Sequence, residues 1–117
     1  MIQAIPPRPE VPEVAPTQAW SKAQQGEAVI VDVREHDEVA EIAVPGALHI
    51  PLGQLAARVQ SIPPEQEVLF LCRSGNRSAY ATEYFRTSVH QRAANVTGGV
   101  IAWFELGLPT SLSHRLG

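Results

Sequence analysis

Residues 67–85 read EVLFLCRSGNRSAYATEYF, and this stretch indicates the fold of the whole chain. Its first five residues are mostly apolar, which is typical of a short strand buried on both faces. A polar run follows, and then a segment over residues 77–89 places Ala81, Tyr84 and Phe85 on one helical face. A buried strand that leads directly into an amphipathic helix is one βα unit, so we expect a parallel sheet covered by helices.

The same alternation recurs along the rest of the chain. Residues 28–33 (AVIVDV) predict a second strand buried on both faces, and residues 47–50 and 93–96 predict two shorter strands. The remaining helix candidates are residues 17–25, with Thr17 as N-cap, and residues 34–41, 52–60 and 100–106. Together these segments predict an α/β domain whose parallel sheet has helices on both faces.

Length and proline distribution divide the chain into three parts. With 117 residues it holds one domain. Five of its ten prolines fall within residues 1–16, and because proline lacks a backbone donor we expect a flexible leader there. The prediction is a single domain over residues 17–110, followed by a C-terminal tail over residues 111–117.

Composition argues against several classes of function. A net charge of −3 disfavours nucleic-acid partners and anionic membrane surfaces. No apolar run approaches the ~20 residues of a membrane-spanning helix, and residues 1–10 lack the features of a secretory signal. The single cysteine, Cys72, excludes an internal disulfide and a cysteine-based zinc site, and the histidines show no metal-ligand spacing. We therefore expect a cytoplasmic, monomeric domain that uses no metal or cofactor.

The chemistry of the chain is concentrated in residues 72–78 (CRSGNRS), which we call the Cys72 loop. Parallel sheets bind ligands beyond the C-terminal ends of their strands, where this loop lies. It contains no proline, so its backbone N–H groups are free to bind an anion, and it ends at a helix N-terminus, which favours negative charge. Gly75 and Asn76 tolerate the positive φ of a tight loop. The predicted anion-binding residues are Arg73, Ser74, Gly75, Asn76 and Arg77.

Cys72 stands at the base of this loop. Arginines and a helix start lower the pKa of a nearby thiol, so we expect a reactive thiolate rather than an inert buried cysteine. Cysteine phosphatases carry an arginine at the sixth residue after the cysteine, whereas here the fifth is Arg77 and the sixth is Ser78. The shorter loop favours an anion or atom smaller than phosphate.

Four motifs in order resemble the single-domain rhodanese-like (thiosulfate sulfurtransferase) family. They are DVRE at 32–35, VPGALHIP at 44–51, the Cys72 loop, and GGVIAW at 98–103 with GLP at 107–109. Ile42 and Ala43 stand where the family commonly has Gly-His. The resemblance implies a rhodanese-like fold with a central parallel sheet of about five strands.

The resemblance also implies an activity. Cys72 would take a sulfane sulfur from thiosulfate or a related small anionic donor, hold it as a persulfide, and pass it to a thiol or protein acceptor. Loop amides would stabilise the outer sulfur, while Arg73 and Arg77 would steer the donor. Two alternatives stay open: a non-catalytic rhodanese-like binding or regulatory module, and an arsenate reductase or phosphatase on the same fold, which the short loop disfavours.

Asp32 and Arg34 lie at the end of the strand predicted over residues 28–33, and we interpret them as a structural ion pair that anchors neighbouring loops. Trp103 is interpreted as a core anchor of the last helix, and His36 as a surface residue. Gly98-Gly99 lacks the third glycine of a nucleotide-binding fingerprint and predicts a turn.

Overall fold

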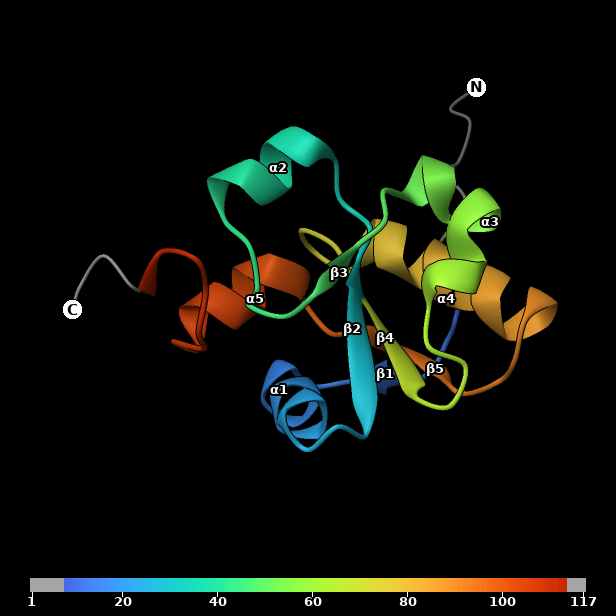
Figure 1. Cartoon of the computed structure of the whole chain (residues 1–117). Coiled ribbons are helices and arrows are strands. Elements are labelled where there is room, and N and C mark those ends of the chain that lie inside the picture. Colours follow the sequence, from blue (N-terminus) through green and yellow to red (C-terminus); the bar gives the residue numbers. More distant parts are fainter. Residues whose placement is uncertain (1–7, 114–117) are drawn as a thin grey trace, which may run out of the picture.

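The computed structural model describes residues 8–113 (Figure 1). Within them lies a five-stranded, wholly parallel sheet in the order β1-β5-β4-β2-β3. The strands are β1 (Glu13–Val14), β2 (Ala28–Asp32), β3 (Leu48–His49), β4 (Glu67–Leu71) and β5 (Ala93–Val96). The helices are α1 (Pro16–Gln24), α2 (His36–Glu41), α3 (Leu55–Arg58), α4 (Asn76–Ser88) and α5 (Gly99–Glu105), with 3-10 turns at Leu52–Gln54 and Val59–Ser61 on either side of α3. The predicted α/β fold is confirmed.

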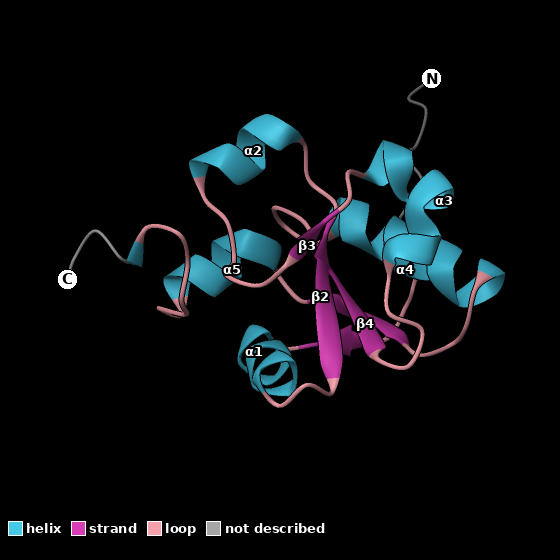
Figure 2. Cartoon of the chain, viewed as in Figure 1, coloured by secondary structure: helices cyan, strands magenta, loops and turns pink. Residues whose placement is uncertain are grey.

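Helices cover both faces of the sheet (Figure 2). On one face α1 and α5 pack against the sheet, and Trp103 is fully buried with its ring edge-on to Trp20 at 5.8 Å between centroids. On the other face α3 and α4 supply Leu55 and Phe85, and Phe85 packs against Phe70 of β4. Trp103 is therefore a core anchor, as predicted. Tyr84, expected on the buried face of α4, is instead 36% exposed.

The central strands β2 and β4 place two loops side by side at the C-terminal edge of the sheet. Val31 pairs with Phe70 and Asp32 with Leu71, and one further backbone hydrogen bond of 2.9 Å joins the Val33 amide to the Leu71 carbonyl. Because both strands end at the same level, the segment that follows Val33 lies beside the Cys72 loop. No helix among residues 8–113 is long and apolar enough to cross a membrane.

The prediction of a flexible leader needs correction in its described part. Glu13–Val14 forms the edge strand β1, which pairs in parallel with β5. Proline lacks a donor but keeps its carbonyl, and the Pro12 carbonyl accepts the Asn95 amide at 2.9 Å. Pro16 begins α1, one residue ahead of the predicted start, because its missing N–H has no partner in a first helical turn.

The two ends of the chain are described only in part. In the predicted tail, Ser111 donates its amide to the Ala43 carbonyl at 2.8 Å and accepts the Ala43 amide through Oγ at 3.0 Å. The first residue of the predicted tail is therefore hydrogen-bonded to the segment between α2 and β3. Residues 1–7 of the predicted leader and 114–117 of the predicted tail lie outside the described residues.

Candidate active site

Residues 72–75 of the Cys72 loop form a tight turn after β4, and its residues 76–78 are the first residues of α4. Gly75 has φ +106° and serves as the N-cap of α4, so it uses the left-handed conformation that its sequence position predicts. Asn76, which was also expected to tolerate positive φ, is the first residue of the helix. Within the Cys72 loop, Gly75 is therefore the residue that supplies the positive φ.

Three donors surround the Cys72 sulfur, which belongs to a residue only 1% exposed. Sγ lies 3.1 Å from the Gly75 amide, 3.3 Å from the Ser78 amide and 3.1 Å from the Ser78 hydroxyl. Burial raises the pKa of the thiol, but hydrogen bonds from the Ser78 hydroxyl and the loop amides outweigh it and hold the pKa below its ordinary value. The direction of this pKa shift is the one expected from the sequence, but its largest lowering causes are neutral hydrogen-bond donors rather than arginine side chains.

The two loop arginines have different surroundings. Arg77 forms a bidentate ion pair with Glu38 of α2 at 2.7 and 2.8 Å. This pair lowers the pKa of Glu38 to about 2 and raises that of Arg77. Arg73 is exposed and forms no ion pair with a described residue. A full positive charge for an anion is therefore available at Arg73, while the charge of Arg77 is already matched.

A buried ion pair lies in the neighbouring loop. Arg34 Nη2 is 2.8 Å from Asp32 Oδ2, and the same atom donates to the Ile42 carbonyl at 2.7 Å. Both side chains are almost fully buried, so the pair fixes the segment between β2 and β3 in the way the sequence predicts. His36 packs edge-on against His49 at 4.8 Å between ring centroids.

The first turn of α5 binds the back of the Cys72 loop. The amide of Val100 donates to the Cys72 carbonyl at 2.9 Å, and the amide of Ile101 donates to the Arg73 carbonyl at 3.1 Å. A Cβ atom on Gly99 would lie 2.4 Å from the Cys72 carbonyl oxygen, and Gly99 has φ +62°. Gly99, the second glycine of the predicted turn, therefore permits the close approach of α5 to the backbone of the Cys72 loop.

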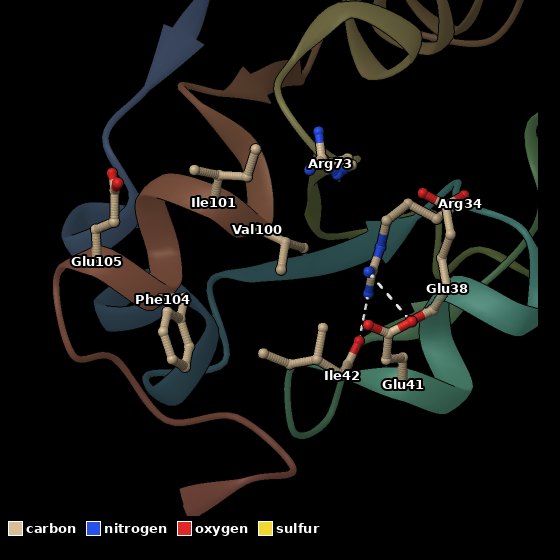
Figure 3. Close-up of a pocket in the computed structure, with 9 residues that line it drawn as sticks. All are labelled: Arg34, Glu38, Glu41, Ile42, Arg73, Val100, Ile101, Phe104 and Glu105. Carbon is tan, nitrogen blue, oxygen red and sulfur yellow. Dashed lines mark hydrogen bonds between the residues drawn. The ribbon is translucent and has the colours of Figure 1, made fainter.

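A pocket of about 420 Å³ lies beside the loop (Figure 3). Its lining residues are Arg34, Glu38, Glu41, Ile42, Arg73, Val100, Ile101, Phe104 and Glu105. The α5 side is largely apolar, with Phe104 56% exposed, and the α2 side carries carboxylates. Figure 3 shows Arg34 reaching the carbonyl groups of Glu38 and Ile42. Among residues 8–113, no three His, Cys, Asp or Glu side chains form a group able to hold a metal ion.

The site residues predicted from the sequence do not include four that surround the Cys72 loop or its sulfur in the structure: Arg8, Glu38, Ser78 and Asn95. The Gly75 carbonyl accepts hydrogen bonds of 3.0 Å from both Arg8 Nη1 and Asn95 Nδ2. One signal was available, since an asparagine within the apolar strand segment AANV requires a hydrogen-bonding partner. The contacts of Arg8 and Glu38 depend on tertiary structure that no local pattern encodes.

Two features define the class of this domain: a parallel sheet covered by helices, and a cysteine just after a strand whose sulfur accepts hydrogen bonds from backbone amides. The model of the rhodanese-like domain matches residues 15–106. The chain belongs to the rhodanese-like domain family, as the motifs predicted.

Known relatives agree with this assignment. A sulfurtransferase of Allochromatium vinosum is 37% identical over 87 residues, covering 74% of this chain and 81% of that protein. A human thiosulfate:glutathione sulfurtransferase is 29% identical over 108 residues, covering 80% and 94%. The solved structure of a human single-domain sulfurtransferase superposes with a TM-score of 0.72 at 28% identity, covering 82% of this chain and 97% of that one. The comparisons therefore support sulfurtransferase activity at the level of the family.

Proposed function

We propose that this protein transfers sulfane sulfur from thiosulfate or a related donor to a thiol or protein acceptor through a persulfide on Cys72. The observation that carries the proposal is the set of donors around Sγ at 3.1 to 3.3 Å. They favour the thiolate, and a thiolate is the form of cysteine that attacks sulfur. Family membership and the names of the relatives support the same reaction class.

In the first half-reaction, the Cys72 thiolate attacks the outer sulfur of thiosulfate. A bond forms between Sγ and that sulfur, and the S–S bond of thiosulfate breaks, so that sulfite leaves with the electron pair. Arg73, whose charge no described carboxylate pairs, binds the dianion before attack. The electrons balance without an external oxidant.

In the second half-reaction, an acceptor thiolate attacks the outer sulfur of the persulfide. The bond between the two sulfurs breaks, and Sγ leaves as a thiolate. Gly75 and Ser78 donate to the atom on which this negative charge returns. The same donors therefore serve the nucleophile in the first half-reaction and the leaving group in the second.

Two features disfavour phosphate chemistry at this site. Ser78 occupies the sixth position after Cys72, where cysteine phosphatases carry arginine. Arg77 at the fifth position is engaged by Glu38. We therefore propose that the loop accepts sulfur and that hydrolysis of aryl phosphates is negligible.

Intact-mass measurement tests the proposal directly. Thiosulfate treatment should leave a protein heavier by one sulfur atom, and later cyanide treatment should remove that mass and release thiocyanate. A Cys72→Ser variant, with its fold checked by circular dichroism, should show neither step. An unchanged mass for folded wild-type protein across several sulfane donors would contradict the proposal, and so would rapid hydrolysis of p-nitrophenyl phosphate.

A further inference from the structure

Asn95 lies on β5, between the edge strand β1 and the central strand β4, where it pairs with Phe70 and is fully buried. Both polar atoms of its side chain face the Cys72 loop. Nδ2 donates to the Gly75 carbonyl at 3.0 Å, and Oδ1 lies 2.5 Å from the Ser78 hydroxyl. Because a carbonyl only accepts hydrogen bonds, Nδ2 must face Gly75, and Oδ1 must therefore face Ser78.

The Ser78 hydroxyl has one proton and two acceptors. Oγ lies 3.1 Å from Sγ of Cys72 and 2.5 Å from Oδ1 of Asn95. A charged acceptor attracts a donor more strongly than a neutral one, so the proton favours Sγ when the sulfur is a thiolate. When Sγ is neutral, as a thiol or as the inner sulfur of a persulfide, the proton favours Oδ1. No proton leaves the hydroxyl, because only its orientation changes.

We propose that Asn95 is a positioning residue for the sulfur-transfer reaction, which holds the Ser78 hydroxyl between Oδ1 and Sγ and competes with the sulfur for its proton. The proposal rests on the proposed function, in which the charge on Sγ disappears and returns in each cycle. In the persulfide state Oδ1 keeps the hydroxyl oriented beside Sγ. When the acceptor attacks, the hydroxyl turns to the leaving thiolate without reorganisation of the loop.

Other charged groups surround the site, but none of their hydrogen bonds ends on Sγ. They are Arg8, Asp32, Arg34, Glu38, Arg73 and Arg77, which come from the segment before β1, the end of β2, α2, the Cys72 loop and α4. The Ser78 hydroxyl is thus the donor whose direction Asn95 sets. Arg8 offers a matched control, because it binds the same Gly75 carbonyl without contacting Ser78.

The test measures iodoacetamide alkylation of Cys72 against pH, which needs no sulfur donor and so is independent of whether thiosulfate is a substrate. Loss of the hydroxyl in Ser78→Ala should raise the alkylation midpoint by about one pH unit. Asn95→Ala removes the competing acceptor, so its midpoint should fall below that of the wild type. In the Ser78→Ala background, Asn95→Ala should have no further effect. Arg8→Ala should leave the midpoint within about 0.3 pH unit of wild type.

Folding of each variant is checked by its thermal melting curve. If Asn95→Ala does not fold, Asn95→Asp replaces it. The charged oxygen of this variant holds the hydroxyl more strongly, so it should raise the midpoint more when Ser78 is present than in the Ser78→Ala background. An Asn95 effect of equal size in both backgrounds would overturn the proposal, because the residue would then act through the fold. An Asn95→Ala midpoint equal to or above that of the wild type would overturn it as well.

Discussion

Arg73 and Arg77 flank the same short loop, yet the structure leaves them with different net effects on an anion. The guanidinium of Arg77 is matched by Glu38, and together they add no net charge beside the loop. Arg73 stands exposed at the rim of the pocket, without a carboxylate partner among the described residues. For the dianionic donor of the proposed reaction, we therefore expect Arg73 and the amides of the loop to supply most of the attraction.

This difference predicts unequal effects on donor binding. Arg73→Ala should raise the KM for thiosulfate at least about fivefold, which corresponds to roughly 1 kcal/mol for one partly screened charge. The matched comparison is the double variant Glu38→Gln/Arg77→Gln, which removes the ion pair without changing the net charge. Its KM should stay within about threefold of wild type. Steady-state kinetics at fixed ionic strength gives both values, and the reverse order of the two effects would refute this assignment.

At this scale the sequence indicates which residues form the loop but not how they pair. Cys72, Gly75 and the helix start follow from local patterns, because a strand end, a glycine and a helix N-terminus are all local features. The pairing of Arg77 with Glu38 joins residues that are far apart in the chain, so it depends on where α2 packs. For the same reason, the sequence suggested arginine charge as the cause of the low thiol pKa, whereas the hydroxyl and amide of Ser78 supply much of it.

At the scale of elements, the contact that defines the site is that of α5 against the Cys72 loop. Its first amides donate to the carbonyls of Cys72 and Arg73, so the loop is held from behind by a helix that begins more than twenty residues later. Gly99 makes this possible, since it lies against the loop backbone in a left-handed conformation. The sequence motif predicted the turn, but not which surface it touches.

Substitution of Gly99 tests this contact. Gly99→Ala should lower the free energy of unfolding by about 3 kcal/mol or more, because left-handed strain adds to a clash with backbone atoms. Gly107→Ala is the matched control: it has a similar φ of +73°, and nothing lies within 4 Å of an added Cβ. Its cost should be about 1 kcal/mol. Urea unfolding measures both, and equal losses would show that Gly99 contributes only its backbone conformation.

At the scale of the whole molecule, the N-terminal segment is part of the sheet. Val14 is buried beside β5, and backbone hydrogen bonds join Pro12 to Asn95 and Val14 to Thr97. Further toward the N-terminus, the Arg8 side chain donates a hydrogen bond to the Gly75 carbonyl. The alternation of strands and helices predicted the other four strands, because each lies in a short, mostly apolar segment. A two-residue strand among prolines has no such pattern, and only its partner β5 reveals it.

Truncation measures the contribution of this segment. A chain without residues 1–14 should lose about 2–4 kcal/mol of unfolding free energy, from the burial of Val14 and the lost hydrogen bonds. A chain without residues 1–7 keeps all of these contacts and is the comparison. Urea unfolding of the two chains and of the full chain gives the values. Equal stability of all three would mean that β1 adds nothing to the sheet.

The pairing of β1 with β5 also orders events during synthesis on the ribosome. Glu13 is made early, but its partner Asn95 is among the last residues of the sheet to be made. Closing so long a stretch of chain is slow compared with forming local contacts, so the edge strand waits for β5. Asn95 also holds Gly75 and Ser78, so the surroundings of Cys72 are completed in that same late step. A nascent chain that stops before β5 already contains Gly75 and Ser78, the donors to the Cys72 sulfur, but it lacks the side chain that holds both residues in place. The site therefore reaches its final geometry only after almost the whole sheet has been made.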